Sequence, residues 1–434
     1  MTTLPLRFGH ERVRRLPRGK DPRTLATVVA YLIVFLVAAG TTFALTPLVR
    51  RLAVRFGAID VPSERKLHTV PTPTMGGLAM WAGFLVAIGV SRLLPFFEPM
   101  NATAVEPFAA VVTCTMMVGL GAIDDRRGTS ALAKLTAQIF IAGVLILLGV
   151  QLLFFLLPSE GLAVLGADEA VPLTILWVLA AANAINLVDG LDGLAAGMVA
   201  IAAATFFIYM VRGADLSESA SVAALLSAIT VGVCLGFLPW NFHPAKIFMG
   251  DTGSMLLGML VAVATISGVG LNPFPPERGD VAVIALPLLV PLLVLAIPLL
   301  DVVLAIVRRT RKGLGIAHAD KEHIFHHLLD IGHGHRGAVL LMYLWSALVC
   351  GSVLAIGVID GWLVAGAIVA GAIVLFLVTA LPRLLERRRN GEANGEANEA
   401  GAADPPGTSE ATLPAPGATT TPASGAAPVD PSAS

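Results

Sequence analysis

The sequence predicts an all-α fold that crosses a membrane many times. Of its 434 residues, 56% are hydrophobic and only 14% are charged, and the mean hydropathy is +0.80. A soluble protein of this length could not bury so much apolar surface. The apolar residues gather into about eleven runs, each long enough to cross a bilayer core of about 30 Å as a helix. These observations indicate a polytopic integral membrane protein.

Each apolar run is expected to be one helix, because the connections between the runs are short and polar. In chain order the runs cover residues 26–48, 75–97, 105–123, 133–156, 171–188, 194–211, 220–239, 253–270, 281–306, 337–357 and 361–382. No interior connection is long enough for a soluble domain. The chain is therefore predicted to consist of a basic N-terminal segment, 1–25, a membrane-embedded domain, 26–385, and a disordered Ala/Pro/Gly-rich tail, 386–434.

The distribution of Lys and Arg predicts the orientation in the membrane, because cytoplasmic loops carry an excess of these residues. Most of them lie in the loops that follow the odd-numbered runs, and these loops are therefore assigned to the cytoplasm. The N-terminal segment, with seven basic residues between Arg7 and Arg23, falls on the other side. The N-terminal segment conflicts with the rule that basic residues gather on the cytoplasmic side. The predicted orientation therefore depends on the loops between the runs.

Charged and amide side chains form five patches at the ends of these runs. They are Asp124 with Asp125, Asn186 with Asp189 and Asp192, Asn241, Asp251, and the stretch His323–His327. A charged side chain is costly in hydrocarbon, so such a group near the membrane indicates function. Every patch follows the third, fifth, seventh or ninth run, and this parity alone places all five on the cytoplasmic face. The sequence thus predicts one polar site at that face.

The loop after the first run is basic and leads to a pair of glycines. It contains Arg65, Lys66 and His68, and Gly76 and Gly77 open the second run. Basic side chains suit an anionic ligand, but lipid headgroups are the commoner explanation. The glycines allow backbone N–H groups to approach a phosphate, or simply allow close helix packing.

Asp124 and Asp125 close the third run and precede two arginines. Adjacent carboxylates repel each other, so a cation, arginine partners or solvent must stabilise them. One interpretation is a solvated helix end paired with Arg126 and Arg127. The other is a Mg²⁺ site or a base that acts on a phosphate nucleophile.

Asn186, Asp189 and Asp192 recur every third residue at the end of the fifth run. On a helix, residues at this spacing share a face, so the three side chains are expected to project together. Gly190 and Gly193 indicate a break or tight packing there. A purely structural origin for three aligned polar groups beside a membrane is the less favoured interpretation.

Residues 240–254 read Trp-Asn-Phe-His-Pro-Ala-Lys-Ile-Phe-Met-Gly-Asp-Thr-Gly-Ser. Asp251 precedes a helix start, where it could cap the helix or bind a metal ion. Asn241 could offer its amide to the edge of a base and Phe248 its ring to the face of one. A buried aromatic residue is the commoner explanation for a single Phe.

Most of the nine histidines fall between 318 and 335, after a basic stretch. Imidazoles bind Zn²⁺, but no cysteine or closed ligand set accompanies these. Beside a basic loop they fit better as donors to phosphate oxygens, and His also carries protons near neutral pH. Asp301, inside the ninth run, is expected to face the protein interior because a charge in lipid is costly.

From Asp60 to Arg336 these motifs, in this order, resemble the polyprenyl-phosphate N-acetylhexosamine-1-phosphate transferase superfamily, glycosyltransferase family 4. The most specific are Asn186-x-x-Asp-Gly-Leu-Asp-Gly-Leu-Ala and Phe248-Met-Gly-Asp-x-Gly-Ser. The superfamily includes the bacterial enzymes that start O-antigen (lipopolysaccharide), teichoic acid and arabinogalactan-linker synthesis, and the phospho-MurNAc-pentapeptide translocase. The resemblance implies a multi-pass phosphotransferase of the bacterial plasma membrane, in which a polyprenyl phosphate attacks a UDP-sugar and UMP leaves.

The resemblance also implies roles for single residues. Asp124 would be the base or orienting group for the lipid phosphate, with Asp125 beside the metal, and Asp251 would be the principal ligand of Mg²⁺ (or Mn²⁺). The substrate-binding set would be Asn186, Asp189, Asp192, Asn241, Phe248, Lys66 and His323, with His326 as a catalytic residue. The implied partners are a UDP-sugar donor, a polyprenyl phosphate acceptor and the membrane, with no nucleic acid and with a homodimer allowed.

Two departures from the family patterns guide the choice of branch. The last loop reads His323-Ile324-Phe325-His326-His327 where the hexosamine branch usually has His-x-His-His-Arg, so His326 is preferred. The segment Thr72-Pro-Thr-Met-Gly-Gly77 is similar to the pentapeptide-translocase branch, but the lysine that usually lies close before it is absent. The last loop also lacks the Pro-x-His-His-His run of that branch, which favours the UDP-GlcNAc:polyprenyl-phosphate GlcNAc-1-phosphate transferase branch. The pentapeptide translocase is the alternative, and an ion-coupled transporter is the alternative of another class.

Overall fold

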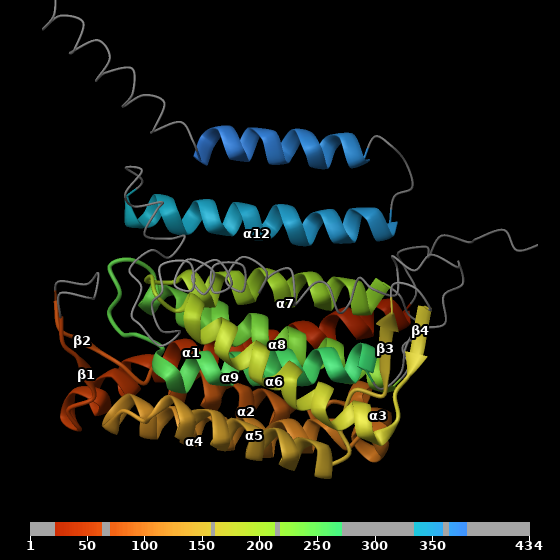
Figure 1. The fold of residues 1–434 in the computed structure, drawn as a ribbon, viewed down its shortest axis with the longest axis horizontal. Helices are drawn as coiled ribbons and strands as arrows, with labels where there is room; N and C mark the ends of the chain where they lie inside the picture. The colour runs from red at the N-terminus through yellow and green to blue at the C-terminus, as the bar shows by residue number, and fades with distance from the viewer. Residues whose placement is uncertain are drawn as a thin grey trace, which may run out of the picture. The chain divides into compact units, whose positions relative to one another are not determined.

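The computed structural model describes residues 22–62, 70–157, 161–212, 218–270, 334–358 and 364–379 (Figure 1). The helices there are α1 (Pro22–Arg55), α2 (Gly77–Ser91), α3 (Glu98–Thr103), α4 (Glu106–Arg127), α5 (Ala131–Leu147), α6 (Ala167–Val188), α7 (Leu194–Arg212), α8 (Glu218–Asn241), α9 (Gly250–Thr265), α12 (His335–Val358) and Val364–Thr379. A 3₁₀ turn, Pro95–Phe97, precedes α3, and a π-helical turn, Ile266–Gly270, continues α9. Strands β1 (Ile59–Asp60) and β2 (Thr72–Pro73) pair antiparallel, as do β3 (Phe154–Leu157) and β4 (Gly161–Val164).

The predicted polytopic membrane fold is confirmed. In the described part of the chain, six helices are long and apolar enough to cross a membrane, and a seventh span is formed if α2 and the bent segment after it count as one. Ala131–Leu147 and Val364–Thr379 are shorter apolar helices. The number of eleven spans is not confirmed, because the expected run 281–306 lies outside the described residues.

Two predicted spans have the wrong boundaries. The run 75–97 ends as a helix at Ser91, and the chain then bends by 84° into the segment Pro95–Thr103, where two prolines cannot continue a straight helix. The run 133–156 ends as a helix at Leu147, where Gly149 has a φ of 88°. Its last residues enter strand β3, so the apolar run joins a helix to a hairpin.

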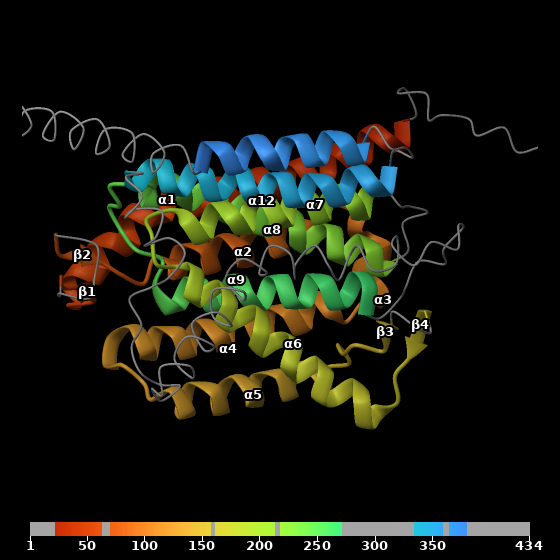
Figure 2. The ribbon, with the colours of Figure 1, turned by 45° about the horizontal axis from the view of Figure 1, so that its top comes forward.

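Helix α9 lies at the centre of the bundle, among α2, α4, α6 and α8 (Figures 1 and 2). Every residue from Thr252 to Thr265 is buried. A helix that is covered on all sides in this way shows no polar face, which is what its sequence shows. Its N-terminus is held by contacts with α2, α4 and α6. Among the described helices, the main neighbours of α5 are α4 and α6.

The N-termini of α2 and α9 meet through glycines. Gly77 N donates a hydrogen bond to Met249 O at 3.0 Å, and Gly76 N donates to Phe248 O at 2.9 Å. A Cβ atom added to Gly77 would lie 2.1 Å from Gly253 N. The glycine pair noted in the sequence therefore serves close backbone packing, which is one of the two roles expected for it.

The variant Gly77→Ala is expected to lower the thermal unfolding temperature of the detergent-purified protein. The added methyl group must push α2 away from α9, which in a packed core costs typically about 1–3 kcal/mol. The matched control is Gly89→Ala on the same helix, where a Cβ atom has nothing within 4 Å. An unfolding temperature that falls equally in both variants would contradict the packing argument.

The predicted terminal segments lie almost wholly outside the described residues. Of the segment 1–25, only 22–25 are described, as the start of α1. The tail 386–434, with its predicted disorder, is not described. The boundaries of the three predicted parts stay predictions.

Candidate active site

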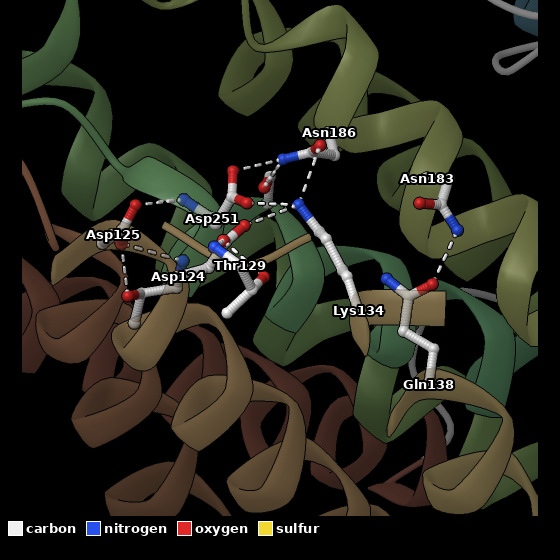
Figure 3. A network of polar contacts seen from close by, with 10 residues as sticks. Asp124, Asp125, Thr129, Lys134, Gln138, Asn183, Asn186 and Asp251 are labelled. Carbon is white, nitrogen blue, oxygen red and sulfur yellow. Dashed lines mark hydrogen bonds and ion pairs between the residues drawn. The ribbon is translucent and has the colours of Figure 1, made fainter. Parts of the chain in front are cut away.

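Four polar side chains meet where α4 and α6 end and where α5 and α9 begin (Figure 3). Lys134 of α5 lies at the centre. Its Nζ atom is 3.0 Å from Asp124 Oδ2 and 3.4 Å from Asn186 Oδ1, and it also donates to Asp251 Oδ2. Three of the five sequence patches therefore meet at one ammonium group, which we call the Lys134 cluster (Asp124, Lys134, Asn186 and Asp251).

Asp251 is held from two sides within this cluster. Its Oδ1 atom accepts a hydrogen bond from Asn186 Nδ2 at 2.6 Å, while its Oδ2 atom accepts from Lys134. The same Asn186 amide donates to Ser254 Oγ at 2.9 Å. Asp251 is the second residue of α9, so the positive end of the helix dipole also stabilises its charge. The carboxylate is thus fixed before any ligand arrives.

Asp125 caps helix α9 from a neighbouring helix. Its Oδ1 atom accepts from Asp251 N at 2.8 Å, and its Oδ2 atom accepts from Thr252 N at 3.1 Å and from Thr252 Oγ1 at 2.5 Å. One interpretation of the sequence was that Asp251 caps its own helix. The structure shows that Asp125 does so instead. Both oxygens of Asp125 accept hydrogen bonds from the start of α9, so in this structure Asp125 positions Asp251. Its expected place beside a metal stays a prediction.

Asp124 is oriented by the turn that follows α4. Gly128, with a φ of 66°, ends the helix and lets Thr129 fold back. Thr129 N and Oγ1 each donate to Asp124 Oδ1 at 2.6 Å, which leaves Oδ2 for Lys134. These contacts stand in place of the pairing with Arg126 and Arg127, which was one of the two interpretations of the sequence. Both arginines are exposed.

The prediction that Asn186, Asp189 and Asp192 project from one helix face is wrong for Asp192. Helix α6 ends at Val188, and the chain turns before α7 begins at Leu194. Asp192 lies in this turn, and its Oδ2 atom accepts from His243 Nδ1 at 2.8 Å and from Ala245 N at 3.0 Å. The spacing of three assumed a helix that had already ended.

Asp189 nevertheless belongs to the electrostatics of the site. Burial, and then the charges of Asp251, Asp125 and Asp192, raise the pKa of Asp189 well above its ordinary value. A carboxyl group among other carboxylates keeps its proton unless a cation compensates the charge. A cation bound beside Asp189 would favour its ionised form.

Asn241 is buried, and its amide fixes the loop between α8 and α9. Its Oδ1 atom accepts from Gly193 N at 3.0 Å, and its Nδ2 atom donates to Ile247 O at 3.1 Å. Phe248 is half-buried in the same loop, and its backbone N donates to Pro73 O at 2.8 Å. The structure thus gives Asn241 a role in shaping the loop, while contact of either residue with a nucleotide stays a prediction.

Lys134 is the main site residue that the sequence interpretation missed. A usable signal was present, because this lysine stands one residue inside the predicted run 133–156, where a charge is costly. The same argument singled out Asp301. One turn further along α5, Gln138 Oε1 accepts from Asn183 Nδ2 at 2.8 Å (Figure 3). This contact ties α5 to α6 next to the Lys134 cluster.

Several predicted residues lie outside the described part of the chain. These are Lys66, His323 and His326, together with Asp301. Their roles stay predictions. Further along the chain, His335 and Arg336 are described and contact the loop after α8.

The donor set fits a hard divalent cation. The Lys134 ammonium marks a point on which oxygens of Asp124, Asp251 and Asn186 converge, and hard cations such as Mg²⁺ choose carboxylate and amide oxygens. Among the described residues, no group of three or more His, Cys, Asp or Glu side chains forms a ready metal site. The oxygens of this cluster would therefore suit such an ion, and solvent or substrate would complete the shell.

Comparison with known proteins agrees with this geometry. The description "Glycosyl transferase family 4" matches residues 107–269, which contain the whole Lys134 cluster. The chain is 41% identical, over 82% of its length and 91% of the relative's, to the decaprenyl-phosphate N-acetylglucosaminephosphotransferase of Mycobacterium leprae (strain TN). It is 35% identical, over 75% and 83% of the two lengths, to the probable undecaprenyl-phosphate N-acetylglucosaminyl 1-phosphate transferase of Bacillus subtilis (strain 168).

A relative from the other branch covers less of the chain. The phospho-N-acetylmuramoyl-pentapeptide-transferase of Desulforudis audaxviator (strain MP104C) is 37% identical over 54% of this chain and 76% of its own length. The family resemblance read from the motifs is thus confirmed along most of the sequence. The chain is a multi-pass membrane transferase that belongs to glycosyl transferase family 4.

Proposed function

We propose that the chain transfers N-acetylglucosamine 1-phosphate from UDP-GlcNAc to a membrane polyprenyl phosphate. An oxygen of the lipid phosphate attacks the β-phosphorus of the donor, and the bond from this phosphorus to the oxygen bridging it to the α-phosphate breaks. The products are polyprenyl-diphospho-GlcNAc and UMP, which leaves with the bridging oxygen. The observation that supports this best is the Lys134 cluster, a fixed arrangement of one ammonium and two carboxylates at the ends of membrane helices.

Lys134 and Asp124 are proposed to handle the lipid phosphate. A phosphate monoester is already ionised near neutral pH, so the attacking oxygen needs orientation more than deprotonation. The Lys134 ammonium offsets its charge, and Asp124, fixed by Thr129, either orients it or accepts its remaining proton. Phosphoryl transfer requires in-line positioning and neutralised oxygens, and this pair supports both.

Asp251 is proposed as the principal ligand of Mg²⁺, for which Mn²⁺ can substitute. When bound, the ion neutralises the diphosphate oxygens on which charge accumulates. Asn186 holds the Asp251 carboxylate, and Asp125 holds the helix start that carries it, so both act as positioning residues. The residues proposed to contact the nucleotide are Asp189, Asp192, Asn241 and Phe248. Those proposed to contact the phosphates and the sugar are Lys66 and the His323–His327 stretch.

The proposed setting is the cytoplasmic face of a bacterial plasma membrane, where UDP-sugars are available. The described site residues lie at helix ends, whereas transporter sites lie near the bilayer midplane, which argues against a transporter. The relatives named for N-acetylglucosamine cover more of this chain than the pentapeptide relative does, which favours UDP-GlcNAc over the pentapeptide donor. The reaction would start the lipid-linked assembly of a cell-envelope polysaccharide.

The test is an assay of UMP release by the full chain in detergent. With UDP-GlcNAc and polyprenyl phosphate, release is expected to require both Mg²⁺ and the lipid, and mass spectrometry is expected to detect polyprenyl-diphospho-GlcNAc. Chelation with EDTA should stop the reaction, and added Mg²⁺ or Mn²⁺ should restore it. UDP-GalNAc and UDP-MurNAc-pentapeptide are assayed side by side as competing donors.

Three results would count against the proposal. No UMP release from UDP-GlcNAc would remove the proposed donor, and turnover of the pentapeptide donor alone would assign the other branch. UMP release that is independent of the lipid would show hydrolysis in place of transfer.

A further inference from the structure

The turn Asp192–Gly193 is held by the loop that follows α8. His243 Nδ1 lies 2.8 Å from Asp192 Oδ2, and Ala245 N donates to the same oxygen at 3.0 Å. Gly193 N donates to Asn241 Oδ1 at 3.0 Å. Both contacts to the carboxylate use Oδ2, so they fix its rotation and the direction in which Oδ1 points.

The same turn and loop are held by helix α12 from a distant part of the sequence. The His335 ring stacks on the His243 ring with centroids 4.8 Å apart and planes at 17°. Arg336 Nε donates to His243 O at 3.1 Å, and the Tyr343 hydroxyl donates to Gly193 O. Helix α12 therefore holds both His243 and the residue after Asp192.

His243 is placed to act through Asp192. The Asp192 side chain is 16% exposed and the His243 side chain 36% exposed, so the carboxylate is mostly buried while the imidazole is partly open to solvent. A hydrogen bond to a carboxylate is worth more than a neutral one, and leaving the acceptor unmatched is costly when it is mostly buried. Among the described residues, loss of His243 would leave Ala245 N as the one remaining donor to this oxygen, so the carboxylate would be held less firmly.

We propose that His243 is a positioning residue for the nucleotide donor, which fixes the Asp192 carboxylate and is itself fixed by His335 and Arg336 of α12. This inference rests on the proposed function, in which Asp192 lies on the nucleotide side. It predicts an effect on the donor and not on the lipid. A merely structural role for the loop would instead affect every kinetic parameter.

The test compares three substitutions of His243 in the full chain. In His243→Asn the amide nitrogen is attached to Cγ, as Nδ1 is, so it can still donate to Asp192. In His243→Gln the nitrogen lies one bond further out, and in His243→Ala there is no donor. His243→Ala and His243→Gln are expected to raise KM for UDP-GlcNAc by about tenfold, the scale of one lost hydrogen bond to a charge. The kcat value and KM for polyprenyl phosphate should change by less than about threefold.

His243→Asn is expected to restore the donor KM to within about threefold of the wild-type value. In an Asp192→Asn background, His243→Ala should add little, because coupled residues are not additive. Tyr343→Phe, which removes the contact to Gly193 from α12, should also raise the donor KM alone. The folded state of each variant is checked by size-exclusion chromatography.

Two results would overturn the inference. One is an equal loss of kcat and of both KM values in all three His243 variants, and the other is a His243→Asn variant that behaves like His243→Ala. Binding of UMP, measured by calorimetry, tests the inference without turnover: His243→Ala should weaken it about tenfold and His243→Asn should not. If the wild type shows no turnover but UMP binding follows this pattern, the result would count against the proposed reaction and not against the inference about His243.

Discussion

Asp251→Asn is expected to lower kcat for UMP release by about two to three orders of magnitude, the usual effect of removing one preorganised electrostatic group. The substitution keeps the shape of the side chain and removes its charge. The amide has a single acceptor oxygen, so only one of Asn186 and Lys134 could still donate to it, and Mg²⁺ would lose its proposed principal ligand. Steady-state UMP release by the detergent-purified protein, with Mg²⁺ varied, measures both effects.

The Mg²⁺ dependence separates a metal ligand from a structural carboxylate. If Asp251 binds the ion, the Mg²⁺ concentration for half-maximal activity should rise in Asp251→Asn while the unfolding temperature changes little. The control is Asp168→Asn, which alters an exposed carboxylate in the first turn of α6, the helix that carries Asn186 near its other end. Full activity in Asp251→Asn, or an equal loss in Asp168→Asn, would remove Asp251 from the proposed mechanism.

The sequence was sufficient to place most of the site on one face. Parity of the apolar runs predicted that Asp124, Asn186, Asn241 and Asp251 share a side, and the structure brings three of them to one ammonium group and the fourth to the adjoining loop. The parity argument succeeded because the chain changes sides of the membrane each time a helix crosses it. The argument needs no knowledge of side-chain contacts.

The tasks of single residues could not be predicted in the same way. Asp125 and Asp124 are adjacent in sequence, yet one caps α9 and the other contacts Lys134, because adjacent residues on a helix point about 100° apart. Asp192 was misplaced because α6 ends at Val188, so the helical spacing of three no longer applies at residue 192. Lys134 was missed because one lysine near a span end resembles an ordinary boundary residue.

Lys134→Met is expected to lower kcat by a similar factor of about two to three orders of magnitude and also to destabilise the protein. Methionine nearly matches the length of the lysine side chain and lacks its charge. The side chains of Lys134, Asp124 and Asp251 are only 15%, 13% and 25% exposed, so two carboxylates would face each other in a poorly solvated site. Breaking a buried ion pair by removing one partner costs about 3–5 kcal/mol, and the lower end applies at this partly open site. Thermal unfolding in detergent measures the loss.

The double variant Asp124→Asn/Lys134→Met distinguishes charge balance from chemistry. Removing one carboxylate together with the ammonium relieves the repulsion, so the unfolding temperature should return toward that of the wild type. Activity should stay low, because the lipid phosphate would then meet neither the ammonium nor the oriented carboxylate. Lys246→Met is the matched control, since this exposed lysine lies with its ammonium 5.1 Å from the centre of the Trp240 ring. Recovery of activity in the double variant would show that Lys134 serves only to balance the charge of Asp124, and that the lipid phosphate is bound elsewhere.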